Sequence, residues 1–204
     1  MSLRKVEIIV SSQHSGSEFY KANSYPHRDR DRNNEPDVYR VPVYFLYLKG
    51  ENEHGMPITM TWKVLRFMPY WNDPTFPNPH YLTKGWTVAG LHELSYRKVT
   101  KYKRNYQVHS AHSIYDGAIV LKKSFYIHAG PSQIPDAPEG TYGSAGCIEV
   151  IGNFYDFKKN IKELSGSSLD NVDDAIEELV SNGLLYVQID HATPPNLSAN
   201  LITH

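Results

Sequence analysis

The chain has a single cysteine among its 204 residues, so it cannot form an intrachain disulfide. It also lacks any apolar run close to the ~20 residues that a membrane-spanning helix requires. Neither sign of charge is in excess, because 21 Lys and Arg face 22 Asp and Glu. Cysteine usage therefore leaves the redox compartment open, and the bulk electrostatic argument for binding nucleic acid or an anionic membrane surface is absent.

The composition is that of a globular protein with a substantial core. Apolar residues make up 40 % of the chain and charged residues 21 %, which excludes a wholly disordered chain. Tyrosine is unusually common, at 15 residues, and it favours strands while also lining sugar and peptide grooves. No internal repeat or convincing boundary is visible, so we expect residues 1–204 to form one mainly β domain of the α+β class.

Segments rich in β-branched and aromatic residues predict a mostly antiparallel sheet. The predicted strands are Val6–Val10, Val38–Gly50, Met56–Phe67, Thr87–His92, Tyr106–His109, Ala118–Leu121, Ser124–His128 and Leu184–Asp190. Residues 11–37 and 68–85 are polar or proline-rich, which predicts long surface loops, and residues 191–204 are expected to form a loose tail.

Two helices are predicted in the last third of the chain. The first, "NFYDFKKNIKEL", has apolar residues at helical spacing and Asn153 as a candidate N-cap. The second, "NVDDAIEELVSNG", has Asn171 as its cap, two aspartates in its first turn, and Gly183 as its stop signal. Short polar stretches separate both helices from the strands around them.

The lone cysteine lies in "TYGSAGCIEV", a setting suited to a nucleophile. Gly143, Ser144 and Gly146 precede Cys147 and allow the backbone to turn sharply and present its N–H groups. A thiol with the ordinary pKa of ~8.5 is only slightly ionised at neutral pH, so it needs a base. His128 is the best candidate, because it ends a predicted strand just before the chain turns.

The segment between these two residues can bring them together. It holds three prolines and three glycines in "AGPSQIPDAPEGTYG", which can loop out and return the chain to the end of the His128 strand. Tyr126 shares a strand face with His128 because side chains alternate along a strand. On the return, the backbone N–H groups of Ala145, Gly146 and Cys147 can converge on a developing oxyanion.

The two motifs together resemble a known catalytic signature. "FYIHAG" and "SAGCIEV", with fifteen residues between His128 and Ser144, resemble the L,D-transpeptidase (YkuD-like) catalytic domain, in which His precedes Ser or Thr and then Gly-Cys. The order also differs from papain-like and NlpC-like peptidases, where the cysteine comes first. The resemblance covers residues 124–189, including the helix and the apolar strand after the cysteine, and it implies a sandwich- or barrel-like β fold with two short C-terminal helices.

The resemblance implies a specific chemistry and location. Cys147 would attack a carbonyl of a peptidoglycan stem peptide, His128 would take and return the proton, the Ala129 carbonyl would orient the imidazole, and Ser144 would support it. The acyl-enzyme would then pass to an amine or to water, without a metal or other cofactor. A cell-envelope or secreted location follows, although "MSLRKVEIIV" is too short in its apolar part for a signal peptide. The residues expected to contact substrate are Glu149, Gly130, His112 and Tyr126.

Two residues depart from the family pattern. Ala145 stands where the family usually has His, which keeps the backbone N–H but removes the side chain. Glu149 stands where Asn or Arg is usual, and an acid there would favour an amine-bearing substrate over a carboxylate-bearing one. This form resembles divergent branches of the superfamily, which include secreted antibacterial toxins that act on the peptidoglycan of rivals.

Three other functions stay open at this stage. An L,D-carboxypeptidase would use the same site with water as acceptor. A metal hydrolase would use His109, His112, His128 and Cys147, although the spacing of the first two is not that of a zinc-protease helix. An inactive module that binds the cell wall would keep the fold without turnover, and Cys147 would then be a buried structural thiol.

Overall fold

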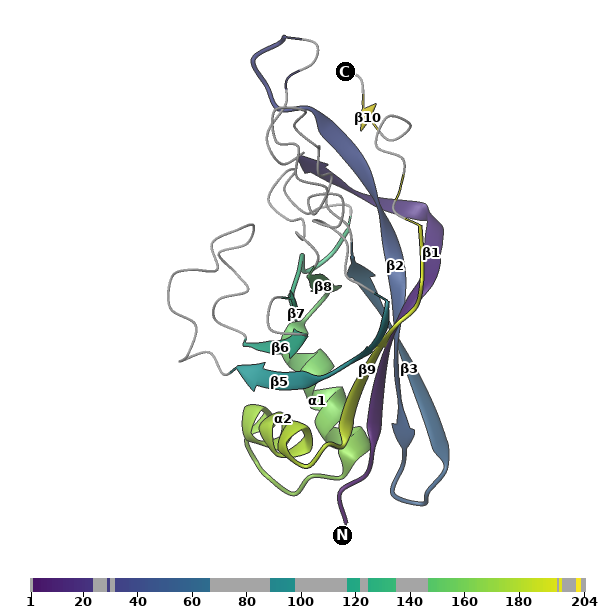
Figure 1. Ribbon diagram of the computed structural model, residues 1–204, viewed down its shortest axis with the longest axis vertical. Coiled ribbons are helices and arrows are strands. Elements are labelled where there is room, and N and C mark those ends of the chain that lie inside the picture. The colour runs from purple at the N-terminus through teal and green to yellow at the C-terminus, as the bar shows by residue number, and fades with distance from the viewer. Residues whose placement is uncertain are drawn as a thin grey trace.

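The computed structural model describes residues 2–23, 29, 32–66, 89–97, 117–121, 125–134, 147–193, 195 and 201–202. Over these residues the protein is mainly β, as expected (Figure 1). The strands are β1 (Val6–Asn23), β2 (Val38–Glu51), β3 (Pro57–Leu65), β4 (Gly90–His92), β5 (Leu94–Arg97), β6 (Ala118–Leu121), β7 (Phe125–Ala129), β8 (Ile148–Ile151), β9 (Leu185–Ile189) and β10 (Leu201–Ile202). The helices are α1 (Phe154–Ser165) and α2 (Val172–Ser181).

The strands form one mixed sheet that closes on itself. Their order is β4-β9-β1-β2-β3-β8-β7-β6-β5, and β10 adds to β2. β1 pairs with β9 and β7 with β8 in parallel, whereas the other described pairs are antiparallel. The first and last strands of this order are separated only by Glu93, so the stretch 90–97 pairs with β9 by its first half and with β6 by its second half. This continuous stretch joins the two edges of the sheet and leaves neither of them open there.

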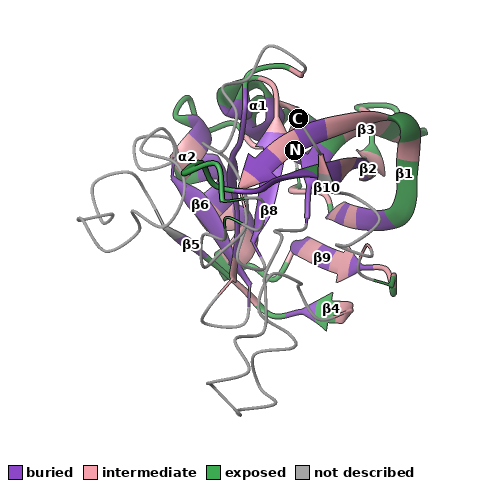
Figure 2. Cartoon of the chain, turned by 90° about the horizontal axis from the view of Figure 1, so that it is seen from above, coloured by how far each residue is buried: buried purple, intermediate pink, exposed green. Residues whose placement is uncertain are grey.

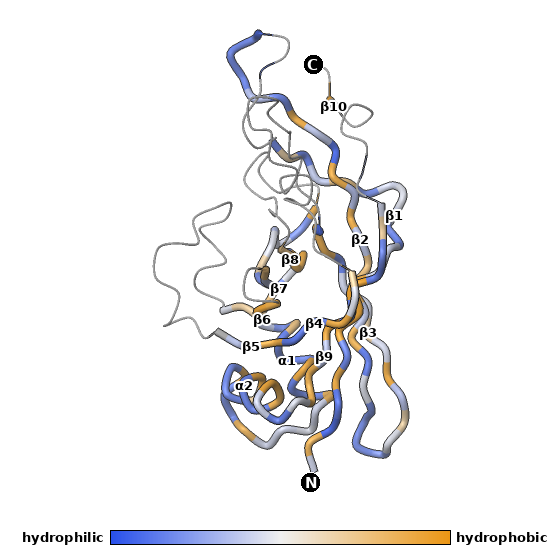
Figure 3. Tube along the Cα trace, in the orientation of Figure 1, coloured by the Kyte–Doolittle hydropathy of each residue, from blue (hydrophilic) through white to orange (hydrophobic). Residues whose placement is uncertain are grey.

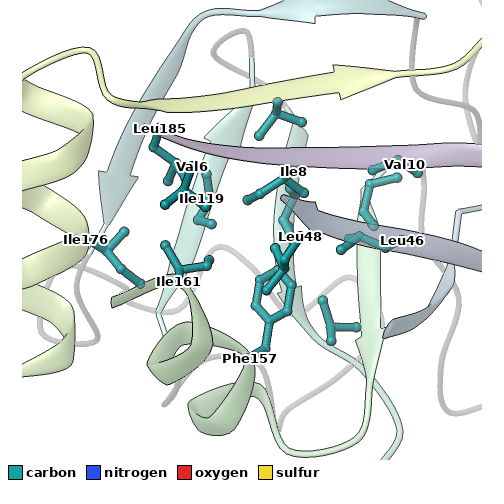
Figure 4. Close-up of a cluster of buried hydrophobic side chains, with 14 of the residues drawn as sticks. Val6, Ile8, Val10, Leu46, Leu48, Ile119, Phe157, Ile161, Ile176 and Leu185 are labelled. Atoms are coloured by element: carbon teal, nitrogen blue, oxygen red, sulfur yellow. The ribbon is translucent and has the colours of Figure 1, made fainter. Parts of the chain in front are cut away.

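A single apolar core fills the inside of this closed sheet. The inward positions of β1 and β2 alternate with outward ones, as a strand with one buried face requires (Figure 4). Side chains from both helices complete the core at one end. In Figure 2 much of β6 and β8 is coloured as buried. The side chains labelled in Figure 4 are Val6, Ile8, Val10, Leu46, Leu48, Ile119, Phe157, Ile161, Ile176 and Leu185.

The two helix caps confirm the predicted helix starts. The side chain of Asn153 accepts hydrogen bonds from the backbone N–H groups of residues 155 and 156, and Asn171 does the same for residues 173 and 174. α1 ends at Gly166, which adopts a left-handed conformation with φ of 67°. α2 ends two residues before Gly183, which also has a positive φ. No helix in the described part of the chain is long and apolar enough to cross a membrane.

Two loop predictions were wrong in part. β1 continues to Asn23, so residues 11–23 of the expected loop 11–37 are strand. Their polar sequence, blue to white along β1 in Figure 3, hid a strand held by backbone pairing with β2 through two register shifts. In the expected loose tail, Leu201–Ile202 pair with Tyr39 and Val38. The predicted loop 68–85 and the predicted strand Tyr106–His109 lie outside the described residues, and the short strand β5 was not predicted.

A buried charged network ties the two helices to β5. The Lys158 ammonium, on α1, is 2.6 Å from a carboxylate oxygen of Asp173, on α2, and the Tyr96 hydroxyl donates to the same oxygen. The Lys158 side chain is only 4 % exposed, so the nearby carboxylate helps to compensate its buried charge.

We expect Asp173→Asn to lower the free energy of unfolding by about 2 kcal/mol, because it removes a carboxylate that lies 2.6 Å from a buried ammonium. Urea denaturation at pH 7 measures this change. Asp170→Asn is the matched control, since Asp170 is exposed and offers only its backbone carbonyl to Lys162. Equal stability of the Asp173 and Asp170 variants would contradict the expected role of the network.

Candidate active site

The parallel pair β7 and β8 sets the two faces of the candidate site. His128 pairs with Glu149, and the flanking pairs are Ile127 with Ile148 and Ala129 with Val150. Paired positions of neighbouring strands point to the same side of a sheet. The side that faces the main core carries Ile127, Ala129, Ile148 and Val150. The opposite side therefore carries Tyr126, His128, Cys147 and Glu149.

Cys147 lies at the start of β8, on the same face as His128. It is a free thiol, 8 % exposed, and packs in a small cluster of its own. Continuing the register by one step places it beside Tyr126 and diagonal to His128. Diagonal neighbours on adjacent strands lie about 7–8 Å apart, within reach of long side chains. The other members of the cluster are Ala118, Val120 and Tyr126.

The imidazole of His128 is oriented by its own strand. Its Nδ1 lies 2.9 Å from the carbonyl oxygen of Ala129, as the resemblance implies. A carbonyl only accepts, so Nδ1 carries the proton in this hydrogen bond. In the neutral ring Nε2 then keeps a lone pair and is the nitrogen available as a base.

Burial makes His128 a weak base. The side chain is 7 % exposed, and the loss of hydration lowers its pKa from 6.5 to about 4. The hydrogen bond to the Ala129 carbonyl opposes this shift without cancelling it. The ring is therefore neutral at pH 7, and the resting site holds no imidazolium.

Gly130 allows the end of β7 to approach β8 closely. Its backbone N–H donates to the carbonyl of Val150 at 2.8 Å. A Cβ at this position would lie 2.9 Å from that oxygen and 2.9 Å from the Cβ of Glu149, closer than real contacts allow. Only glycine fits, and the Glu149 side chain, 1 % exposed, packs over it. The predicted substrate contact Glu149 is thus a buried acid next to His128 in the register.

The structure brings together some of the predicted site residues. Tyr126, His128 and Cys147 share one face, Ala129 orients His128, and Gly130 and Glu149 adjoin them. The oxyanion hypothesis, the metal hypothesis and the supporting role of Ser144 stay predictions, because residues that they need lie outside the described ranges. These residues are Ser144, Ala145, Gly146, His109 and His112. Among the residues that the structure does describe, no group of three or more His, Cys, Asp and Glu is placed to hold a metal ion.

Sequence reasoning missed a second polar site, a cavity in the inner face of β1 and β2. Six of its eight described lining residues come from residues 11–37 and 191–204, which were expected to be a loop and a tail. The only sequence signal was the polar stretch after Val10, where the alternation of apolar and polar residues in β1 stops, and this signal is too weak to predict a cavity. The lining residues are Ser12, His14, Pro42, Tyr44, His191, Ala192, Thr193 and Pro195.

Comparison of the chain with protein-family models, with curated proteins and with solved structures finds no match.

Proposed function

We propose that this protein is a cysteine acyltransferase of the L,D-transpeptidase type, acting on peptidoglycan stem peptides. The observation that carries the proposal is the orientation of His128 by the Ala129 carbonyl, on the sheet face that also bears the only thiol of the chain. The sequence motif around both residues supports it. The closed β fold with two late helices is compatible with a single L,D-transpeptidase-like domain.

The proposed reaction runs through a thioester. The sulfur of Cys147 attacks the carbonyl at the L-centre of the stem diamino acid while Nε2 of His128 takes the thiol proton. The tetrahedral intermediate then collapses, the C–N bond breaks, and His128 returns the proton to the departing D-amino acid. Because the pKa of His128 is about 4, the proton moves during the attack and not before it. The thioester then passes to an amine, which gives a cross-link, or to water, which gives carboxypeptidase action.

Glu149 fits an acyl acceptor that carries an amine. Its register pairing with His128 puts a carboxylate group beside the base, on the same face as Cys147. A carboxylate attracts an ammonium group and repels a second carboxylate, and this effect is strong where water is excluded. Because Glu149 is itself only 1 % exposed, we propose that it favours amine-bearing over carboxylate-bearing stem peptides through its charge near the site and not by direct contact.

A non-catalytic role is the main competing proposal. Cys147 packs against Ala118, Val120 and Tyr126, which is also how a small structural thiol packs in a wall-binding module. A carboxypeptidase or a secreted antibacterial effector would share the acyl-enzyme, so these variants differ in acceptor and target and not in the nucleophile. A cell-envelope or secreted location belongs to each of these wall-directed proposals.

Mass spectrometry of the protein after incubation with disaccharide-tetrapeptide tests the proposal. We expect a mass increase equal to the donor minus its terminal D-amino acid, localised by digestion to the peptide that contains Cys147. Prior alkylation of the thiol should remove the adduct. An unmodified Cys147 and no released D-amino acid, over a series of stem peptides, would support the wall-binding module instead.

A further inference from the structure

The cavity lined by Ser12, His14 and Tyr44 lies at the open end of the closed sheet, away from the helices. It has a volume of about 570 Å³, in the range of small-molecule sites. It opens between the inner face of β1 and β2 and the chain that follows β9. Tyr44 marks this face as the inner one, because it pairs with Val64 and belongs to the main core. The helices pack at the other end, where Gly50 of β2 contacts Leu164.

Irregular pairing of β1 creates this cavity. The register between β1 and β2 shifts on both sides of His14, so the strand does not pack flat there. Beyond β9, the backbone N–H of Asp190 donates to the carbonyl of Val10 at 2.9 Å. This bond holds residues 191–193 and Pro195 alongside the irregular part of β1, and they form the third wall.

The wall behind the cavity is charged but internally compensated. Arg66 is fully buried and donates to the carbonyls of Ser11 at 2.9 Å and Asp190 at 3.1 Å. Its guanidinium lies 5.4 Å from the ring centre of Tyr44. Burial lowers the pKa of Arg66, and the charges of Tyr44 and Asp190 oppose this shift only in part. Arg66 thus contacts the ring of Tyr44 but is not among the residues that line the cavity.

The lining carries neutral polar groups and small apolar surfaces. Among the residues that the structure describes, the lining contains no carboxylate, ammonium or guanidinium, and its titratable groups are two exposed imidazoles and one phenol. Burial raises the pKa of Tyr44, which keeps the phenol neutral. His14 meets the Tyr44 ring edge-on, with centroids 5.8 Å apart and planes at 76°, and the two rings form a corner. Ser12 and Thr193, which carry hydroxyl groups, line the same space.

From this chemistry we infer that the cavity is a binding site for a neutral saccharide. A sugar ring presents hydroxyls in its plane and apolar C–H groups on its faces. The hydroxyls suit the imidazole, phenol and alcohol groups of the lining, and the faces suit the aromatic corner and Pro42, Ala192 and Pro195. The described part of the lining offers a charged ligand no carboxylate, ammonium or guanidinium as counter-charge, which disfavours anions and carboxylate-rich peptides.

The occupant is the glycan chain of peptidoglycan, and this choice of source rests on the proposed function. The cavity is on the other side of the sheet from the candidate catalytic residues. Tyr44 and Val64 face the main core, whereas the next residue, Leu65, pairs with Glu149 and faces outward with it. The saccharide site is therefore an anchor separate from the Cys147 site, which would raise the local concentration of stem peptides on the same polymer.

Isothermal titration calorimetry with two uncharged saccharides tests the site and its source. The probes are the N-acetylglucosamine trisaccharide and glycan strands stripped of their peptides. We expect both to bind, and His14→Ala or Tyr44→Phe to weaken binding at least tenfold. His54→Ala is the matched control, because His54 is an exposed histidine in the turn between β2 and β3, and its loss should change nothing.

The outcomes separate this proposal from that of the catalytic site. Cys147→Ala should bind both saccharides as tightly as the unaltered protein, so loss of turnover leaves the anchor intact. Binding of the trisaccharide without the strands would keep the saccharide site and overturn the wall glycan as its source. No binding of either probe, or equal binding by the His14 and His54 variants, would overturn the site itself.

Discussion

Replacement of Cys147 by alanine is expected to lower kcat/KM for stem tetrapeptides by at least about 10³-fold, because it removes the atom that forms the thioester. The fold should persist. The side chain that is shortened is small and lies in a minor cluster, so the cost in unfolding free energy is about 1 kcal/mol. Released D-amino acid, quantified over time, measures the first effect, and thermal unfolding measures the second.

Val120→Ala is the control that separates chemistry from packing. Val120 belongs to the same cluster as Cys147 and is also buried, but it has no reactive group. If the thiol matters only as a packing group, the two variants should lose similar amounts of activity and stability. If it is the nucleophile, the Val120 variant should keep most of its turnover while losing more stability. A full-rate Cys147→Ala protein would end the catalytic proposal.

The parts of the fold that were predicted correctly have local signals. Ala118–Leu121 is a strand with the predicted bounds, and the helix starts at Asn153 and Asn171 were visible because an N-cap is a property of a few adjacent residues. The second half of β1 had no such signal. Its residues are mostly polar, and only their pairing with β2, whose partner residues lie fifteen or more positions further along the chain, makes them a strand. The closure of the sheet through 90–97 is likewise a pairing between segments far apart in sequence.

The same distinction applies to the candidate site. The contact between His128 and the Ala129 carbonyl joins neighbours in sequence, and the shared face of Tyr126 and His128 follows from alternation, so both could be expected. The parallel register of β7 with β8 could not be predicted from the sequence, because it depends on the close approach at Gly130 and on the pairing of β8 with β3. Burial also has no sequence signature here, and it is burial that sets the proton affinity of the imidazole.

The strongest consequence of that burial is a loss of stability in mild acid. The pKa of His128 is about 4 in the folded protein and near 6.5 when the chain is unfolded. Above pH 6.5 both states hold a neutral ring, so the group makes no contribution to the pH dependence. Between pH 6.5 and pH 4, His128 becomes protonated in the unfolded chain but stays neutral in the folded protein. His128 should therefore cost the fold up to about 3 kcal/mol as the pH falls through this window.

Urea denaturation from pH 7.5 to pH 4.5 isolates this effect by comparing the protein with His128→Gln. Glutamine can still donate to the Ala129 carbonyl but does not titrate, so the variant should lose less stability in acid than the unaltered protein. His54→Gln, at an exposed position, should leave the slope unchanged. The same low pKa predicts that His128 stays neutral, and so able to act as a base in acyl transfer, well below pH 6.5. Identical pH dependence for the two His variants would mean that folding does not lower the pKa of His128. That result would contradict the neutral, oriented base on which the proposed attack relies.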